Sequence, residues 1–458
     1  MPCRRANFTS RMRPLCFAPA RDDLSPVPTE PSLHMPLDAR LVQAVTEATE
    51  ARRDAIIALH RQFVQTPSVT GNEGPMSQRV EEAFRRFALQ TESWVATAEE
   101  MRNHLEHVGE QARYDGRLNV VGRRFGAGGG RSILLNAHID TVPEGDPSLW
   151  SHPPYAADLV DGRVYGRGSC DMKGGLTTYL AALGALDACK VRLRGDVTIA
   201  ATVGEEDGGL GALATVLRGY RADAALVTEP TQLALVTACE GSLVFRITIT
   251  GRSAHAATRD EGVSALEKFI PIMQDLQAFG RERNATLSHP LYDVFANKVP
   301  VNIGVVRAGN WASTVPESLE AEVRVGFLPG EELERFKRVV RDRILGVAAT
   351  DPWLRDHPPE ITFFGGQFIA AETPVDAPIC DAIRVAHRAV TGKAPKVEAA
   401  TYGADMRHFI GFGGMPCVMY GAGDIRLAHG PDEYLEVEEL MTAARVVALA
   451  LAEWCGVA

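Results

Sequence analysis

Acidic and histidine side chains stand at the ends of apolar runs in this sequence. The run "RSILLNAHIDTVP" carries His138 and Asp140 near its end. The run "DVTIAATVGEEDGG" reads as a buried strand and ends in Glu205, Glu206 and Asp207. Burying neighbouring carboxylates costs several kcal/mol unless a positive charge compensates them. The adjacent glutamates therefore call for a cation at this point of the fold.

Three further segments supply the same residue types. Asp171 lies in "YGRGSCDMKGGL" ahead of a helix, Glu229 follows a strand in "LVTEPT", and His429 lies in "AHGPDEY" after the strand "PCVMYGAG". Each residue alone has an ordinary structural interpretation, such as a helix N-cap for Asp171 or a solvated strand end for Glu229. Together, five α/β units each end in His, Asp or Glu, which favours a metal site.

The ligand types and their number indicate two metal ions. A mixed set of nitrogen and oxygen donors suits zinc or a similar borderline metal, and cobalt or manganese would fit as well. Five ligands exceed the need of one tetrahedral zinc with an open position. A carboxylate that bridges two ions, which lie roughly 3.5–4 Å apart in two-metal hydrolases, resolves the count. Asp140 shares a strand face with His138 and could accept its second ring N–H.

The elements that must position these residues form an α/β domain with an insertion. Strands and helices alternate up to about residue 238, which predicts a layered catalytic domain with a largely parallel sheet. Ligands of such sheets bind beyond the carboxyl ends of the strands. Residues 239–365 read instead as strand, helix, two strands and helix, an α+β sandwich inserted into the first domain. The first pattern returns over 366–458, so 37–238 and 366–458 form the two parts of one domain.

The composition limits the kinds of molecule and the compartment that we expect for this protein. The net charge of −10 argues against nucleic acid or an anionic membrane. No apolar run reaches the roughly 18–20 residues that a transmembrane helix needs. The eight cysteines form no C-x-x-C pair, which fits a reducing compartment and predicts a cytoplasmic protein. Residues 1–36 are rich in Pro and Arg without periodicity, and we expect a disordered extension there.

The order of the motifs resembles a known family. "HIDTVP", "YGRGSCDMKGG", "GEEDGG", "TEPT", "GRSAHAA" and "AHGPDEY" follow one another as in the zinc aminoacylase family, which includes acetylornithine deacetylase, succinyl-diaminopimelate desuccinylase and glutamate carboxypeptidase. The resemblance covers nearly everything after residue 50. It implies that His138 and Glu229 hold one zinc ion, that Glu206 and His429 hold the other, and that Asp171 bridges them.

The resemblance also implies the catalytic roles. Glu205 would be the general base that takes a proton from water and passes it to the leaving amine. Asp140 would support His138, and a cis peptide would follow Asp171. His255, in "GRSAHAA" of the inserted domain, would reach the site of a partner subunit and stabilise the oxyanion there. The working enzyme would then be a homodimer that pairs through residues 239–365.

Substrate contacts are less determined by the sequence. Arg324 in "AEVRVGFLPG" could bind a substrate carboxylate as a bidentate fork, and Asn310 and Arg407 are further candidates. For each of the three, a purely structural role is an equal alternative.

The sequence therefore predicts a two-metal amidohydrolase that removes the acyl group from an N-acyl amino acid or a related small amine. The alternative within the fold is a metallo-exopeptidase acting on dipeptides or on a C-terminal residue. A nucleotide-binding protein is disfavoured because "GAGGG" (126–130) precedes a strand and opens no helix. A catalytically dead scaffold is disfavoured because both Glu205 and Glu206 are retained. The sequence does not identify the acyl group or the amine.

Overall fold

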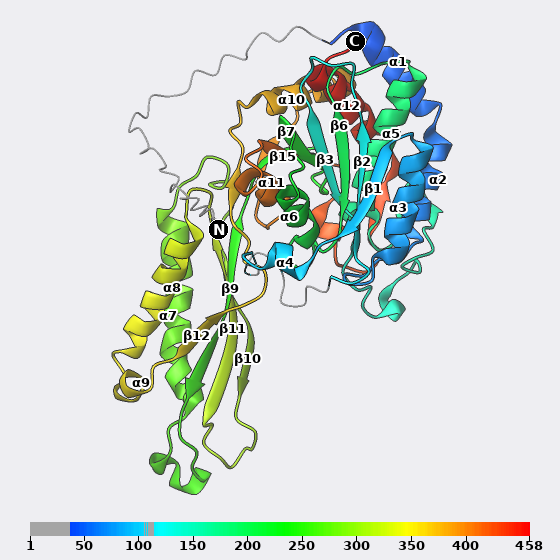
Figure 1. Ribbon diagram of the computed structural model, residues 1–458. Helices are drawn as coiled ribbons and strands as arrows, with labels where there is room; N and C mark the ends of the chain where they lie inside the picture. The colour runs from blue at the N-terminus through cyan, green and yellow to red at the C-terminus, as the bar shows by residue number, and fades with distance from the viewer. Residues whose placement is uncertain (1–36, 105, 107, 109–113) are drawn as a thin grey trace, which may run out of the picture. The chain divides into compact units, whose positions relative to one another are not determined.

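The computed structural model describes residues 37–104, 106, 108 and 114–458, so the expected disordered extension at 1–36 lies outside the described residues (Figure 1). Three helices open the described chain, where apolar residues recur at spacings of three and four: α1 (Ala39–Glu50), α2 (Arg53–Val64) and α3 (Gly74–Arg86). Among the described helices, none is both long enough and apolar enough to cross a membrane.

A nine-stranded sheet forms the centre of the α/β part. Its strands are parallel at the centre, from β6 through β3 and β7 to β15, and the outer pairings are antiparallel except that β14 is parallel to β8. The predicted α/β class with a largely parallel sheet is confirmed. The order along the sheet is β1 (Gln90–Val95), β2 (Leu118–Arg124), β6 (Val197–Thr202), β3 (Ile133–His138), β7 (Ala224–Val227), β15 (Cys417–Met419), β8 (Leu235–Cys239) and β13 (Ala371–Glu372), with β14 (Val397–Ala400) also pairing with β8.

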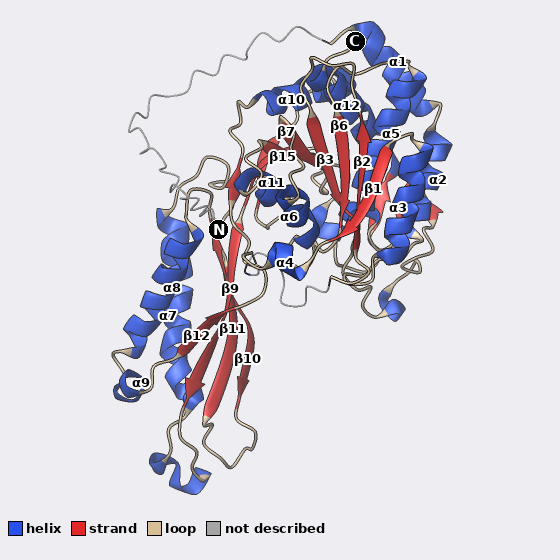
Figure 2. Ribbon diagram, viewed as in Figure 1, coloured by secondary structure: helices blue, strands red, loops and turns tan. Residues whose placement is uncertain are grey.

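Helices cover both faces of this sheet (Figure 2). On one face α1 packs with α5 (Gly174–Ala188), α10 (Pro378–Thr391) and α12 (Val437–Cys455). On the other face lie α6 (Leu210–Leu217) and α11 (Met406–Gly411), near the short helix α4 (Ala98–Met101). Helix α5 is buried along nearly its whole length, which explains why its sequence is apolar on all sides rather than on one stripe.

Residues 241–363, which we call the β9–β12 segment, have a separate antiparallel sheet and a separate apolar core. Alternate residues of β9 are buried, among them Phe245 and Ile247, and they join Phe269 and Phe336 from the covering helices in that core. The sheet order is β10 (Val301–Ala308), β11 (Ser318–Phe327), β9 (Gly241–Thr250) and β12 (Glu360–Phe363), with α7 (Ala265–Thr286), α8 (Leu333–Ala348) and α9 (Pro352–Asp356) alongside.

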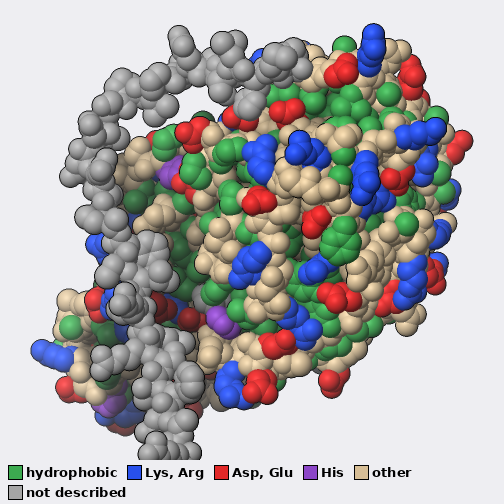
Figure 3. Space-filling model, turned by 45° about the horizontal axis from the view of Figure 1, so that its top comes forward, with side chains coloured by type: hydrophobic (Ala, Val, Ile, Leu, Met, Phe, Trp, Pro, Cys, Tyr) green, Lys and Arg blue, Asp and Glu red, His purple; other side chains and the backbone are tan. Residues whose placement is uncertain are grey.

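A small three-stranded sheet was not expected from the sequence. It consists of β16 (Tyr434–Glu436), β5 (Arg163–Tyr165) and β4 (Leu159–Val160). It pairs the segment that follows His429 with the segment that precedes Asp171. Elsewhere on the surface, Figure 3 shows acidic and basic side chains interspersed over the face it presents.

Candidate active site

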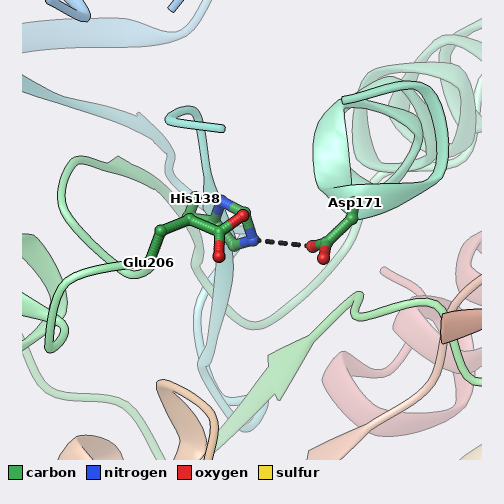
Figure 4. A group of neighbouring side chains, drawn as sticks. All are labelled: His138, Asp171 and Glu206. Atoms are coloured by element: carbon green, nitrogen blue, oxygen red, sulfur yellow. Dashed lines mark hydrogen bonds and ion pairs between the residues drawn. The ribbon is translucent and has the colours of Figure 1, made fainter. Parts of the chain in front are cut away.

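His138 is the last residue of β3, and its ring lies between two sets of partners. Its Nε2 lies 3.0 Å from Asp171 Oδ1 and 4.0 Å from Glu229 Oε1. Its Nδ1 lies 3.0 Å from the backbone carbonyl oxygen of Asp140, which fixes the ring orientation. Figure 4 shows the ring of His138 directed toward Asp171, with Glu206 approaching from the loop after β6.

The carboxylate of Asp140 contacts His138 and also holds the turn after β6. Its Oδ1 lies 3.6 Å from His138 Nδ1, farther than the carbonyl oxygen of the same residue. It accepts hydrogen bonds from the backbone N–H groups of Glu205 (3.2 Å) and Glu206 (3.3 Å), and from the Thr70 hydroxyl (3.0 Å). The backbone carbonyl of Asp140 makes the shorter contact with the histidine, and its side chain also orders the turn that carries the two glutamates.

Asp171 is shared between two histidines. Its Oδ1 faces His138, and its Oδ2 lies 3.6 Å from His429 Nε2. His429 Nε2 in turn lies 3.0 Å from Glu206 Oε2. The expected cis peptide between Asp171 and Met172 is confirmed. The structure thus brings the five predicted ligands into one group with Asp171 at its centre.

The loop after β6 is braced by a buried ion pair that the sequence did not reveal. Arg117 donates to both carboxylate oxygens of Glu73, at 2.7 to 3.1 Å, and both side chains are almost fully buried. Its Nη1 also lies 3.7 Å from Asp207, the third acid of the run. Gly204 has φ +72°, and a Cβ there would lie 2.7 Å from the Arg117 guanidinium. Asp207 is therefore a half-buried structural residue, and burial raises its pKa to about 6.

The electrostatics of the group favour a cation. Burial raises the pKa of Glu205 well above its usual range, and the carboxylates of Asp405 and Glu229 raise it further. Burial likewise raises the pKa of Glu206, with Asp171 adding to the effect. Burial alone would lower the pKa of His138, but the hydrogen bond to Asp171 and the nearby acids hold it well above its usual value.

The donor set fits a divalent metal. Ligand atoms of His138, Asp171 and Glu206 all lie within 4.8 Å of one another. Glu229 is almost fully buried, and its Oε1 has no hydrogen-bond partner within the described part of the chain. A buried carboxylate oxygen without a donor is costly, and a metal ion would supply the missing partner.

A cavity of about 380 Å³ opens onto this group. Arg324 of β11 and Ser242 of β9 form part of its wall, together with the aromatic rings of Phe368 and Tyr402. Sequence reasoning missed Ser242, Phe368 and Tyr402. The two aromatic residues lie in glycine-rich stretches, "FFGGQF" and "TYGAD", where no periodic pattern marks them.

Two of the three substrate-binding candidates do not line the cavity. Arg407 is fully buried, donates to the carbonyl oxygens of Gly208 (2.7 Å) and Ala404 (3.1 Å), and stacks on Phe368 with its guanidinium carbon 3.8 Å from the ring centre. It supports the cavity wall from behind, because its donors are directed to the backbone. Asn310 is exposed in the turn between β10 and β11.

His255 is exposed in the β9–β12 segment and does not line the cavity of its own chain. It precedes the short 3-10 helix Ala256–Glu261, and its Nδ1 accepts the backbone N–H of Ala257 at 3.1 Å. Because Nδ1 contacts the backbone of the turn, Nε2 is the ring nitrogen that could contact a group outside the turn.

Comparisons with known proteins agree with the motif order. Residues 134–453 match the family described as peptidase family M20/M25/M40. The N-formyl-4-amino-5-aminomethyl-2-methylpyrimidine deformylase of Halalkalibacterium halodurans is 29% identical over 342 residues, which cover 71% of this chain and 79% of the relative. The acetylornithine deacetylase of Myxococcus xanthus is 30% identical over 343 residues, which cover 74% and 85%.

The fold also has solved counterparts. The YXEP protein of Bacillus subtilis, described as a dinuclear metal binding peptidase, superposes with a TM-score of 0.59 at 17% identity and covers 88% of this chain and 99% of its own. At this identity the likeness shows the fold alone. The family match and the sequence relatives confirm the resemblance inferred from the motifs.

Proposed function

Because the chain belongs to peptidase family M20/M25/M40, whose members hydrolyse amide bonds, we propose that it removes the acyl group from an N-acyl amino acid or a related small N-acyl amine with two bound metal ions. The observation that carries this proposal is the shared carboxylate of Asp171, with one oxygen facing His138 and the other facing His429. A carboxylate held in this way suits a bridge between two cations.

We assign the ligands from these contacts. His138 and Glu229 would hold one ion, Glu206 and His429 the other, and Asp171 both. Zinc suits this mixture of imidazole and carboxylate, and cobalt or manganese would be accepted by the same donors. When bound, the ions would polarise the amide carbonyl and make water more acidic.

Glu205 is the proposed general base. Its backbone N–H is fixed by Asp140, and its side chain lines the cavity beside the metal ligands. Its carboxylate would take a proton from the attacking water and deliver it to the nitrogen of the leaving amine. Glu206, the next residue, would remain a metal ligand.

Arg324 is the proposed contact for a substrate carboxylate. Arg324 lies in the cavity wall, and the planar fork of donors of an arginine matches a carboxylate in a bidentate way. Phe368 and Tyr402 offer apolar surface to the rest of the substrate. An exopeptidase remains the second candidate, because Arg324 would bind the C-terminal carboxylate of a peptide equally well.

We further propose a homodimer that pairs through residues 239–365. In it, His255 of each subunit would reach the cavity of the other and donate to the developing oxyanion. The exposure of His255 supports this proposal, since its ring is accessible to a second chain.

The test is primary-amine release from a panel of N-acetyl, N-succinyl and N-formyl amino acids, dipeptides and an N-formyl aminomethylpyrimidine. The last compound belongs in the panel because one relative is named for it and two aromatic rings line the cavity. Each assay is run with zinc or cobalt and again after chelation. Cleavage of a blocked amino acid or amine only with metal supports the deacylase. Cleavage of dipeptides alone favours the exopeptidase, and metal binding without turnover of any compound contradicts both.

A further inference from the structure

Glu433 is a buried carboxylate that accepts four hydrogen bonds from one short stretch of chain. Its side chain is 1% exposed. Its Oε1 accepts the backbone N–H groups of Cys170 (3.0 Å) and Asp171 (3.2 Å). Its Oε2 accepts the backbone N–H of Gly168 (3.0 Å) and the guanidinium of Arg167 (2.7 Å). Both oxygens are thus engaged by residues 167–171.

These donors belong to the turn that presents Asp171. Three of the four are backbone N–H groups ahead of α5, where no helical carbonyl is available to them. One of the three is the N–H of Asp171 itself, so the backbone of the central carboxylate residue is held directly. The bonds to charged acceptors are stronger than those to neutral ones, which makes this a stiff attachment.

Glu433 also lies four residues after His429, in the same connection between β15 and α12. The attachment is reinforced next to it, because Gly166 donates its N–H to the Glu433 carbonyl at 2.7 Å and Tyr434 pairs with Tyr165 in the small sheet. One residue therefore fastens the loop that carries His429 to the turn that carries Asp171, across more than 260 residues of sequence.

We propose that Glu433 is a positioning residue that fixes Asp171 relative to His429 and thereby sets the affinity of the metal pair. Its own oxygens face the turn, so it acts through Asp171 and not by contact with an ion or a substrate. The inference rests on the proposed function for the identity of the ligand, a divalent cation. Partners that orient metal ligands in this way typically contribute a factor of about 10 to 100 in metal affinity.

The test compares Glu433→Gln with the matched control Glu331→Gln. Gln keeps the shape of Glu433 but turns an NH₂ group toward two donors, so one oxygen's bonds are lost. Glu331, in the β9–β12 segment, also accepts one backbone N–H (Leu328, 2.9 Å) and one guanidinium (Arg283, 2.8 Å). Its replacement makes the same chemical change far from the metal ligands in sequence and without a bond to them.

Zinc affinity is measured by competition with a chromophoric chelator, and the visible spectrum of the cobalt-loaded protein reports ligand geometry. We expect Glu433→Gln to bind zinc about 10- to 100-fold more weakly, with an altered cobalt spectrum. We expect Glu331→Gln to match the wild type in both. If Glu433→Gln lowers the melting temperature but binds zinc as the wild type does, its role is structural only and the inference is wrong.

A second variant covers the case in which Glu433→Gln does not fold. Glu433→Asp keeps the charge and shortens the side chain by one methylene, and wild-type zinc affinity in this variant would overturn the inference. The proposed function fails separately: a wild-type protein that binds two zinc ions but cleaves no amide refutes the activity, while the affinity comparison still decides the role of Glu433. A wild-type protein that binds no zinc refutes both.

Discussion

The carboxyl edge of the central sheet and the β9–β12 segment differ in where their acidic side chains lie and in whether basic side chains pair with them. At the edge, Glu205, Glu206 and Glu229 lie together in a largely buried group, and Glu229 Oε1 lacks a hydrogen-bond partner among the described residues. In the β9–β12 segment, acids lie near the surface and are paired with basic side chains, such as Asp275 with Arg343 (2.7 Å), Glu331 with Arg283 (2.8 Å) and Asp351 with Lys268 (2.7 Å).

This difference distinguishes the acids of the β9–β12 segment, which stabilise the fold, from the acids at the sheet edge, which we propose bind a ligand. An ion pair near the surface neutralises itself and contributes about 0–1 kcal/mol. A buried acid without a compensating charge destabilises the folded chain, and a cation bound at the sheet edge would compensate the acids there. Substitutions in the buried acidic group should therefore change catalysis or metal binding. Substitutions in the ion pairs near the surface should change only the stability of the fold.

The largest effect is expected at Glu205. Glu205→Gln should lower kcat by about 10²–10⁴-fold, because the amide cannot accept the proton of the attacking water. Metal content, measured by elemental analysis, should stay at the wild-type level because Glu205 is not a proposed ligand. A variant that keeps wild-type kcat would remove Glu205 from the chemistry.

The second largest effect is expected at His255, and a loss of activity there would show that the β9–β12 segment takes part in catalysis. His255→Ala should lower kcat by about 10²–10³-fold with the metal content unchanged, because an oxyanion donor is lost. His357→Ala is the control, since His357 is also an exposed histidine of this segment. If the two variants have the same kcat, His255 takes no part in the reaction and the proposed catalytic groups lie at the edge of the central sheet alone.

Glu240 lies between β8 and β9, where the two regions meet. It is fully buried, and within the described residues neither of its oxygens has a hydrogen-bond partner. Burial raises its pKa from 4.5 to about 8, although Arg324 and Arg283 oppose the rise. Between these two values the unfolded chain is ionised at Glu240 and the folded chain is not, so this residue makes the protein less stable as the pH rises.

Glu240→Gln should remove this dependence. Its free energy of unfolding should be close to that of the wild type near pH 4.5 and exceed it increasingly up to about pH 8, by on the order of 4–5 kcal/mol. Urea unfolding of both proteins across this range measures the difference. A constant difference at all pH values would mean that Glu240 does not titrate as described.

The smallest effect is expected at the surface pair of Asp275 and Arg343. Asp275→Asn should lower the free energy of unfolding by about 0–1 kcal/mol, because the half-buried pair lies near the surface and Arg343 retains Glu282 as a partner at 2.8 Å. Urea unfolding checks the stability, and zinc titration should give the wild-type affinity. A change in zinc affinity would contradict the separation of the two regions.

The sequence predicted the residues that stand at strand ends and missed those whose role depends on distant contacts. His138 ends one apolar strand and Glu206 follows another, so sheet geometry alone brings them to one edge. Nothing in the "PDEY" stretch marks Glu433 as buried, because its four donors lie more than 260 residues away. Arg407 suggested a substrate contact, but its guanidinium is directed to backbone carbonyls, which no sequence pattern encodes.

The two crossings between the central sheet and the β9–β12 segment lie side by side. Ser242 and Phe368 exchange two backbone hydrogen bonds, at 2.8 and 3.0 Å, and both line the cavity with Arg324. The five proposed metal ligands all lie outside the stretch that these crossings enclose. Recombination between relatives at these two crossings would replace Ser242, Arg324 and Phe368 together and leave the proposed metal ligands unchanged. The substrate selectivity could then change in a single genetic step.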